Sequence, residues 1–205
     1  MKRCLIIAGG DYAPVCRPEE GDFLIACDRG FVHAQRAGIV PDLLIGDFDS
    51  YGGPLPEGVP VLRLPAEKDD TDTMYAVRWA SEHGFEEVRL CCALGGSLDH
   101  LLANLQTLHF AVNRGMRASA GDEKTELRVL GPGSLRLPER AGWTLSVLAL
   151  TDRVEGLTIR GAKYELADAV LTNAFPLGVS NAFRGDAEIS LRQGVAAVLL
   201  CRRGG

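Results

Sequence analysis

Short, wholly apolar runs alternate with amphipathic stretches through the first half of the chain. The apolar runs predict strands at residues 5–8, 23–27, 43–45, 59–64 and 88–94. Helices are predicted at about 31–37, from Asp72 to about His83, and from Gly96 to Gly115, where leucines recur with helical spacing. Continuous apolar strands that alternate with helices are typical of a parallel sheet covered on both faces. The first half is therefore predicted to be a three-layer α/β domain with a mostly parallel sheet.

The second half has a different texture, with short strand-like runs and no helical stripe. The runs lie at 126–130, 134–137, 143–150, 154–159, 187–191 and 195–201. Glycine and proline residues separate several of them, as at 131–133. Short strands bounded by turn residues indicate an antiparallel β-sandwich or a barrel-like domain, and we expect a β-sandwich. We place the boundary near residues 121–124, which gives domains of 1–122 and 123–205.

The composition allows a proper core, because 46% of the 205 residues are hydrophobic. The net charge of −5 and the pI of about 5.4 argue against a general nucleic-acid-binding face. No run approaches the ~20 apolar residues that cross a membrane, and the N-terminal run is too short for a signal peptide. The six cysteines form no C-x-x-C pair. We therefore expect reduced cysteines that act as small hydrophobes, and a cytoplasmic protein.

Aspartates gather where predicted strands end and helices begin. They are Asp28, Asp47, Asp49, Asp69, Asp70, Asp72 and Asp99. Asp47 and Asp49 follow a strand and a glycine, and such a pair at the carboxyl edge of a sheet suits a hard cation such as Mg²⁺. Unit charges ~4 Å apart at an effective dielectric of ~20 repel by about 4 kcal/mol, so a crowded acidic rim favours bound cations. The alternatives are a strand-ending turn for Asp47 and Asp49, helix capping for Asp70, and complement to the helix dipole for Asp99.

A glycine pair, Gly95 and Gly96, separates the strand at 88–94 from the next helix. Backbone N–H groups at such a junction can approach an anion. The chain has neither a Walker A sequence nor G-x-G-x-x-G, so a standard nucleotide-binding loop is not expected. His100 and Asn104 lie one turn apart near this helix start, where a lone histidine is more often a structural hydrogen-bonding residue than a catalyst.

Five short motifs occur in order along the chain. They are Cys-Asp-Arg-Gly at 27–30, Ile-Gly-Asp-Phe-Asp-Ser at 45–50, Lys-Asp-Asp-Thr-Asp at 68–72, Leu-Gly-Gly-Ser-Leu-Asp-His at 94–100 and Gly-Val-Ser-Asn at 178–181. The ordered set resembles the motifs of the thiamine pyrophosphokinase (thiamine diphosphokinase) family, over nearly the whole chain. The resemblance implies an α/β nucleotide-binding domain followed by a β-sandwich domain, in a homodimer. It also implies Mg²⁺-dependent transfer of the pyrophosphoryl group of ATP to thiamine, which yields thiamine diphosphate and AMP.

The resemblance also implies roles for individual residues. The metal and triphosphate platform would comprise Asp47, Asp49, Asp69 and Asp72, and the catalytic set Asp47, Asp49, Asp72 and Asp99. The nucleotide pocket would include Asp28, Gly30, Lys68, Asp69, Gly95 and Gly96. Thiamine would be held by Ser180 and Asn181, with Tyr164 stacked on its pyrimidine ring. A half-buried strand aromatic is the alternative for Tyr164, and a solvated side chain is the alternative for Lys68.

Three positions depart from the family pattern. Ser97 stands where an arginine is common, Arg29 where a glycine is common, and Ala182 where an acid is frequent. Arg29 could replace the guanidinium that position 97 lacks. Two other functions stay open at this point. An apolar strand followed by Asp-x-Asp also fits a Mg²⁺-dependent aspartyl phosphatase with Asp47 as nucleophile, and a divergent chain could bind thiamine and nucleotide without turnover.

Overall fold

The computed structural model describes residues 2–14, 17–48, 51, 53–65, 67 and 69–203. The chain divides into two compact units, Met1–Glu123 and Lys124–Gly205. The helices of the described residues all lie in the first unit, and strands occur in both. The predicted mixed α/β class is therefore confirmed.

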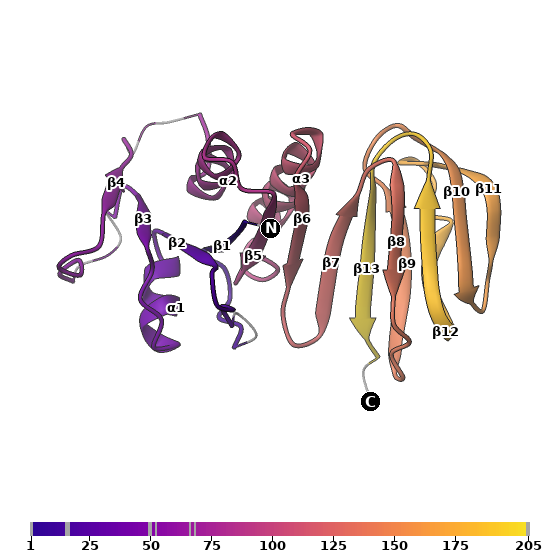
Figure 1. Ribbon diagram of the computed structural model, residues 1–205, viewed down its shortest axis with the longest axis horizontal. Coiled ribbons are helices and arrows are strands. Elements are labelled where there is room, and N and C mark those ends of the chain that lie inside the picture. Colours follow the sequence, from indigo (N-terminus) through magenta and orange to yellow (C-terminus); the bar gives the residue numbers. More distant parts are fainter. Residues whose placement is uncertain are drawn as a thin grey trace. The chain divides into compact units, whose positions relative to one another are not determined.

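The first unit is built on a parallel sheet (Figure 1). Its strands are β1 (Arg3–Ile7), β2 (Phe23–Cys27), β3 (Leu43–Gly46), β4 (Val61–Arg63), β5 (Glu87–Cys91) and β6 (Arg117–Gly121). They lie in the order β6-β5-β1-β2-β3-β4, and every neighbouring pair is parallel. The chain runs outward from β1 to β4 and then returns to the other side of β1 with β5. The place between β1 and β5 is thus a topological switch point, and α/β sheets bind ligands at the carboxyl ends of the strands there.

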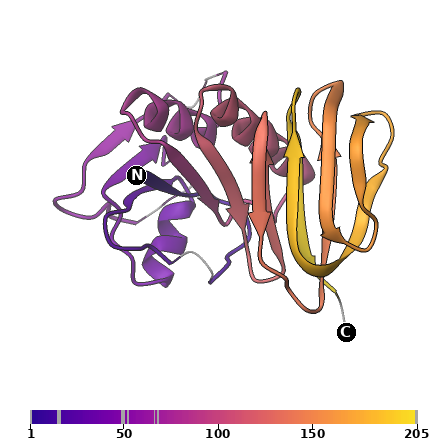
Figure 2. The ribbon, with the colours of Figure 1, turned by 45° about the vertical axis from the view of Figure 1, so that its right-hand side comes forward.

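Helices cover both faces of this sheet. Their bounds are α1 (Gly30–Arg36), α2 (Asp72–Glu82) and α3 (Leu98–Asn113). The first helix lies on one face, and α2 and α3 lie together on the other (Figures 1 and 2). Leu5 and Ile7 of β1 pack with Phe31 of α1, and Ile6, which points the opposite way, is also fully buried. Burial on both faces explains why these strands are apolar throughout.

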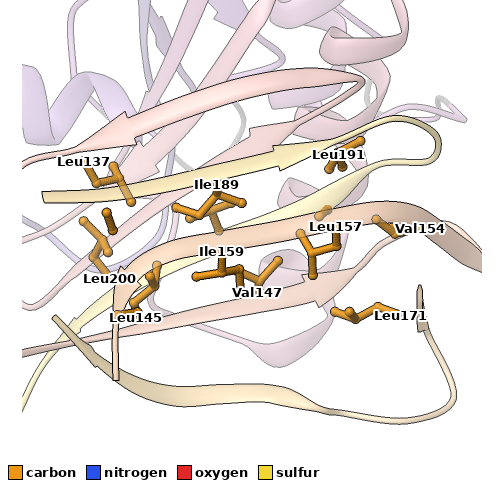
Figure 3. Close-up of a cluster of buried hydrophobic side chains, with 14 residues drawn as sticks. Leu137, Leu145, Val147, Val154, Leu157, Ile159, Leu171, Ile189, Leu191 and Leu200 are labelled. Carbon is orange, nitrogen blue, oxygen red and sulfur yellow. The ribbon is translucent and has the colours of Figure 1, made fainter. Parts of the chain in front are cut away.

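The second unit consists of antiparallel strands. They are β7 (Thr125–Leu130), β8 (Gly133–Leu137), β9 (Trp143–Ala149), β10 (Arg153–Ala162), β11 (Leu166–Thr172), β12 (Gly178–Leu191) and β13 (Ala196–Arg202). The first part of β12 pairs with β9, and its last part pairs with β8 and β10. Leu145, Val147, Ile159 and Ile189 belong to the core of this unit (Figure 3). The long strand β12 therefore joins two groups of strands around one apolar core.

Three stretches of strand were not predicted from the sequence: β6, β11 and the first part of β12. The end strand β11 is largely exposed, so burial imposes no apolar pattern on it. The first part of β12 contains Gly178, Ser180 and Asn181, which interrupt any alternation of apolar and polar residues. Edge position and local irregularity thus hide strands from a hydrophobic pattern.

The expectation of reduced cysteines is wrong for Cys91, which is disulfide-bonded. Cys4, Cys27, Cys92 and Cys201 have free thiols, and burial is the main cause that raises the pKa of Cys27 well above its usual value. Among the described residues, no helix is both long and apolar enough to cross a membrane.

Candidate active site

A cavity of about 480 Å³ opens in the first unit at the carboxyl ends of the parallel strands. The turns after β1, β2 and β5 and the starts of α2 and α3 line it with Ala8, Gly9, Gly10, Asp11, Cys27, Asp28, Arg29, Thr71, Asp72, Thr73, Gly95, Gly96, Ser97, His100 and Asn104. The cavity therefore lies at the switch point between β1 and β5, where the topology of the sheet favours a ligand site.

Two glycine turns pack against each other in the cavity wall. The Gly10 amide, after β1, donates to the carbonyl oxygen of Cys92 at 2.9 Å. A Cβ on Gly10 would lie 2.6 Å from that oxygen and 2.7 Å from the carbonyl oxygen of Gly95. Likewise, a Cβ on Gly95 would overlap the side chain of Asp11. The tight packing requires glycine, and it leaves a wall of bare backbone that a ligand can approach closely.

Asp28 and Asp72 bring two carboxyl groups together in this cavity. Asp28 follows β2, Asp72 begins α2, and their side chains are hydrogen-bonded. Burial, this hydrogen bond and the charge of Asp72 raise the pKa of Asp28 to about 7, although the Phe48 amide, which donates to Asp28 Oδ1 at 3.3 Å, acts in the opposite direction. Gly46 makes room for Asp28, since a Cβ there would overlap Asp28 Oδ1. Near neutral pH the pair therefore shares a proton.

The chemistry of this pair fits Mg²⁺. Proteins bind Mg²⁺ through one or two carboxylates, and phosphate oxygens and water complete its coordination. Within the part of the chain that the structure describes, no group of three or more His, Cys, Asp or Glu side chains is arranged to hold a metal. Asp28 and Asp72 would thus be the protein's ligands at this place, with the metal in place of the shared proton.

Asp47 and Asp69, the other described acids of the predicted platform, are not among the residues that line the cavity. Asp47 follows β3, and its charge contributes to the raised pKa of Asp28. Asp69 is exposed. Asp49 and Lys68 lie outside the described residues. Of the predicted metal set, the structure thus brings Asp72 to the cavity, and it places Asp28 there as the second acid.

Neighbouring side chains hold the start of α2. Thr71 Oγ1 accepts a hydrogen bond from the Met74 amide at 3.1 Å, which is the usual N-cap arrangement. Asp70 forms an ion pair with Arg78 at 2.6 Å. Asp72 is therefore the acid of this segment that lines the cavity, whereas Asp70 stabilises α2 through its ion pair with Arg78.

Two further predicted residues have structural roles. The exposed Asp99 accepts hydrogen bonds from the Ser97 hydroxyl and from the His100 amide, the latter at 2.9 Å, and these lower its pKa. Asp99 lies in the first turn of α3, where an acid complements the helix dipole, which is the alternative considered from the sequence. Gly30 packs so closely against β1 that a Cβ at this position would overlap the carbonyl oxygen of Ile7. Asp99 and Gly30 are both outside the cavity lining.

The turn after β1 was not predicted as part of the site. Gly9, Gly10 and Asp11 all line the cavity. The signal was nevertheless present in the sequence, because a glycine pair directly follows an apolar run, as at Gly95 and Gly96. Recurrence of one pattern at two strand ends is the information that would have identified the turn.

Cationic and amide groups of the lining come from α3 and from the turn after β2. The exposed Arg29 follows Asp28, and in the described lining it is the one arginine. Ser97 presents a small side chain to the cavity, and His100 lies beside it in the lining. Asn104 Nδ2 donates to the carbonyl oxygen of Ala93 at 2.9 Å, so this amide holds the turn after β5.

In the second unit, the structure brings two of the three predicted thiamine residues, Tyr164 and Asn181, together. Tyr164 lies on the turn between β10 and β11 and is 63% exposed, so it is not a half-buried strand aromatic. Asn181 Oδ1 accepts from the Tyr164 amide at 3.0 Å, and Asn181 Nδ2 donates to the Tyr164 carbonyl oxygen at 2.7 Å. Ser180 has a φ of 59° where the pairing of β12 with β9 is irregular. Its amide donates to the buried Ser146 Oγ at 2.9 Å, which holds this irregularity in place.

Comparison with known proteins now identifies the family. The family model of the "Thiamin pyrophosphokinase, catalytic domain" matches residues 18–119, and that of the "Thiamin pyrophosphokinase, vitamin B1 binding domain" matches residues 134–196. A crystal structure of a thiamin pyrophosphokinase family protein from Enterococcus faecalis is 31% identical, with 100% of both chains covered and a TM-score of 0.80. The chain belongs to the thiamin pyrophosphokinase family.

Two results from Bacillus subtilis agree with this assignment. Its thiamine pyrophosphokinase (strain 168) is 29% identical over an alignment of 191 residues, and the match covers 88% of this chain and 89% of the relative. A crystal structure of thiamine pyrophosphokinase from Bacillus subtilis has a TM-score of 0.87 at 26% identity and covers 98% of this chain and 99% of the other. The Asp-x-Asp motif at Asp47 thus belongs to a thiamin pyrophosphokinase and not to an aspartyl phosphatase.

The two family matches fall on different units of this thiamin pyrophosphokinase. The catalytic-domain match contains Asp28 and Asp72, but it begins after the turn at Gly10. The vitamin B1 binding match contains Tyr164 and Asn181. The residues that the sequence singled out therefore lie inside the segments that define the family.

Proposed function

We propose that the chain is a thiamine diphosphokinase, which transfers the pyrophosphoryl group of ATP to the hydroxyl group of thiamine and forms thiamine diphosphate and AMP. The observation that carries the proposal is the carboxyl pair of Asp28 and Asp72 in a switch-point cavity of a thiamin pyrophosphokinase chain. Transfer from ATP requires a place for a triphosphate and its cation, and this cavity offers bare backbone and acidic oxygens side by side.

We assign ATP binding to the first unit, residues 1–122. The glycine turns at Gly10 and Gly95 allow the phosphates to approach the backbone, and the starts of α2 and α3 favour negative charge. Arg29 supplies a guanidinium at the lining and so replaces the cation that is absent at Ser97. Lys68 is proposed as a second phosphate partner from its place in the sequence.

The acids are proposed to hold the divalent cation of the ATP complex. Asp28 and Asp72 are the ligands that the geometry favours, and Asp47, Asp49 and Asp69 extend the acidic rim. Mg²⁺ bound there would neutralise phosphate charge and orient the triphosphate. Pyrophosphoryl transfer depends on positioning and on charge neutralisation more than on covalent help from the protein. These residues therefore act by binding and orienting the reacting groups.

We assign thiamine binding to the second unit, residues 123–205. Thiamine is an aromatic cation, and the exposed ring of Tyr164 can both stack on it and attract its charge. Ser180, on the irregular part of β12 next to Asn181, is proposed to contribute its hydroxyl group to thiamine binding. A cytoplasmic homodimer is part of the proposal as the sequence implied it, and the exposed apolar residues Phe175, Leu177 and Val179 offer a surface for the partner copy.

The decisive experiment is product analysis with the purified protein, ATP, Mg²⁺ and thiamine. We expect thiamine diphosphate and AMP in equal amounts, and no nucleotide product when thiamine is left out. Formation of ADP with thiamine monophosphate would overturn the proposed pyrophosphoryl transfer. Binding of both substrates without any product would identify the chain as the non-catalytic binding protein considered from the sequence.

A further inference from the structure

The hydrogen-bonding capacity of Asn181 is almost fully used inside the second unit. A carboxamide has two acceptor positions on its oxygen and two N–H donors. Asn181 Oδ1 accepts from the amides of Tyr164 and Ala182, at 3.0 Å and 2.9 Å, and Nδ2 donates to the Tyr164 carbonyl oxygen at 2.7 Å. The residue is 8% exposed. Three of its four positions are therefore occupied, and little of the side chain is left for a ligand.

The same bonds fix the turn that carries Tyr164. The Lys163 amide donates to the carbonyl oxygen of Ala182 at 2.7 Å, next to the two bonds between Tyr164 and Asn181. Within the turn, Glu165 Oε1 accepts from the Gly161 amide at 2.9 Å. The turn is thus attached to β12 through two consecutive residues. A turn that is already ordered loses little conformational entropy when a ligand binds to it.

Tyr164 is the residue of this group that is placed to meet a ligand. Its backbone is held on both sides, yet its ring is largely exposed. An aromatic ring fixed in this way offers a large contact area at low entropic cost, and its face attracts a cation. The division of labour is therefore between a buried amide that holds and an exposed ring that contacts.

We propose that Asn181 is a positioning residue that acts on thiamine through the backbone of Tyr164. The inference rests on the proposed function and deepens it, because it replaces the direct contact that the family resemblance implied for Asn181. Loss of Asn181 would free the turn, and the ring of Tyr164 would then have to be ordered on binding. We expect Asn181→Ala to weaken thiamine binding about 5- to 10-fold, as for one newly mobile side chain and its turn.

A double-mutant cycle distinguishes positioning from direct contact. Thiamine affinity is measured by calorimetry, and the KM for thiamine by product formation, for Asn181→Ala, Tyr164→Ala, Tyr164→Phe and the two double variants. A positioning residue should lose its effect in the Tyr164→Ala background, where less than about a 2-fold change is expected, and keep it in the Tyr164→Phe background. The same 5- to 10-fold loss in both backgrounds would overturn the inference.

Three further measurements guard the interpretation. The KM for ATP should be unchanged in Asn181→Ala, since the two substrates use different residues. Asn173→Ala is the matched control, because it removes a hydrogen bond of 3.1 Å to Asp152 elsewhere in the same unit. It should leave the KM for thiamine unchanged. Amide exchange at Tyr164 should accelerate in Asn181→Ala, and this result reports on the turn without any substrate.

The outcomes separate this inference from the proposed function. A wild-type protein that binds thiamine but forms no thiamine diphosphate contradicts the proposed function. The double-mutant cycle can then still be measured, because calorimetry reports thiamine affinity without turnover. If the wild-type protein forms thiamine diphosphate but the losses of thiamine affinity in Asn181→Ala and Tyr164→Ala are additive, the positioning role of Asn181 alone is contradicted. Failure to bind thiamine at all contradicts both. Unchanged amide exchange at Tyr164 in Asn181→Ala also overturns the positioning role, whatever the kinetics.

Discussion

The cavity of the first unit and the Tyr164 region of the second unit are organised by different means. In the first unit the parallel sheet itself brings the ends of β1, β2 and β5 to one place, and glycines keep the wall free of side chains. In the second unit an irregular strand and a turn display the site residues, and the buried side chains of Ser146 and Asn181 hold the backbone. Topology therefore prepares the place for a charged, backbone-bound ligand, whereas side-chain clamps prepare the place for an aromatic one.

Among substitutions in the cavity, we expect those in the carboxyl pair to reduce activity most. Asp72→Asn would leave Asp28 with a neutral neighbour and would remove one of two acidic ligands for the cation. We expect kcat/KM for thiamine diphosphate formation to fall about 10²- to 10³-fold, the scale of losing one electrostatic contact to a transferring group. Steady-state kinetics over a range of Mg²⁺ concentrations would measure it, and the midpoint of the Mg²⁺ dependence should rise.

Asp70→Asn is the matched control for that experiment. Asp70 is two residues away, but it pairs with Arg78 and lies outside the cavity lining. A partly exposed ion pair of this kind stabilises by only about 0.2–1 kcal/mol. The activity should therefore stay within about 3-fold of the wild type. Equal losses from the two substitutions would show that the charge of the whole segment matters, and not the pair in the cavity.

The glycine wall gives the next largest effect. In Gly10→Ala the new Cβ would meet two backbone carbonyl oxygens, and backbone cannot move aside as a side-chain end can. We expect the KM for ATP to rise about 10-fold or more, as the turn shifts away from the phosphates by a fraction of an ångström. The KM for thiamine should change much less, which would keep the two regions separate.

Gly38→Ala tests whether any glycine substitution would do the same. Gly38 has a φ of 68° with no atom within 4 Å of its would-be Cβ, and it lies outside the cavity lining. The strain of that backbone conformation should cost about 1–2 kcal/mol of stability. The KM for ATP should stay at the wild-type value. A rise there comparable to that of Gly10→Ala would contradict the role assigned to the wall.

The shared proton predicts a pH dependence of stability in the cavity. The pKa of Asp28 is about 7 in the folded protein, above the ~3.9 of an unfolded aspartate. Its contribution is therefore complete below about pH 4 and is lost as the pH rises through 7. Without Mg²⁺, Tm should fall by a few degrees between about pH 5 and 8, and it should fall less in Asp28→Asn.

Thermal unfolding in a chelator would measure this slope. Addition of Mg²⁺ at about pH 8 should raise Tm in the wild type, because a cation then replaces the proton between the two acids. Asn181→Ala, in the other unit, should keep the wild-type slope. Identical slopes in the wild type and Asp28→Asn would refute a shared proton at this pair.

In the second unit, Ser146 holds the backbone of β12 in the way that Asn181 holds the turn with Tyr164. Ser146→Ala removes the acceptor for the Ser180 amide, in a place where the strand pairing is already irregular. We expect the KM for thiamine to rise about 3-fold, the scale of one neutral hydrogen bond, with the KM for ATP unchanged. Ser190→Ala, on the regular part of β12, is the control and should leave both values unchanged.

The cavity of the first unit was the more predictable of the two regions. Continuous apolar runs revealed its strands, and acids or glycines at their ends marked the ligand edge. The pairing of Asp28 with Asp72 was not predictable, because the two residues lie far apart in the sequence and meet only through the order of the strands. The sequence pattern shows which residues lie at the end of a strand or the start of a helix. It does not show which of these ends face each other in the fold.

The second unit shows the opposite limit. Its residues Tyr164, Ser180 and Asn181 were found by resemblance, and two hydrogen bonds join Tyr164 to Asn181. The role of Asn181 was not visible, because an asparagine that holds a turn and one that binds a ligand have the same sequence signature. Nor could Ser146 be found, since a serine inside a buried strand gives no pattern of its own.

The smallest expected effect concerns the charge beside Tyr164. Lys163 Nζ lies 5.1 Å from the centroid of the Tyr164 ring. The face of the ring attracts cations, so Lys163 and the cationic thiamine would be drawn to the same place. Lys163→Gln would remove an exposed cation that repels a cationic substrate, and the KM for thiamine should fall about 2-fold. Arg136→Gln, which removes an exposed charge on β8, is the control and should have no effect. Because the repulsion acts through solvent, the difference should shrink at about 0.5 M salt. A rise in KM at every salt concentration would instead mean that Lys163 contributes to the hold on the ring, as Asn181 does.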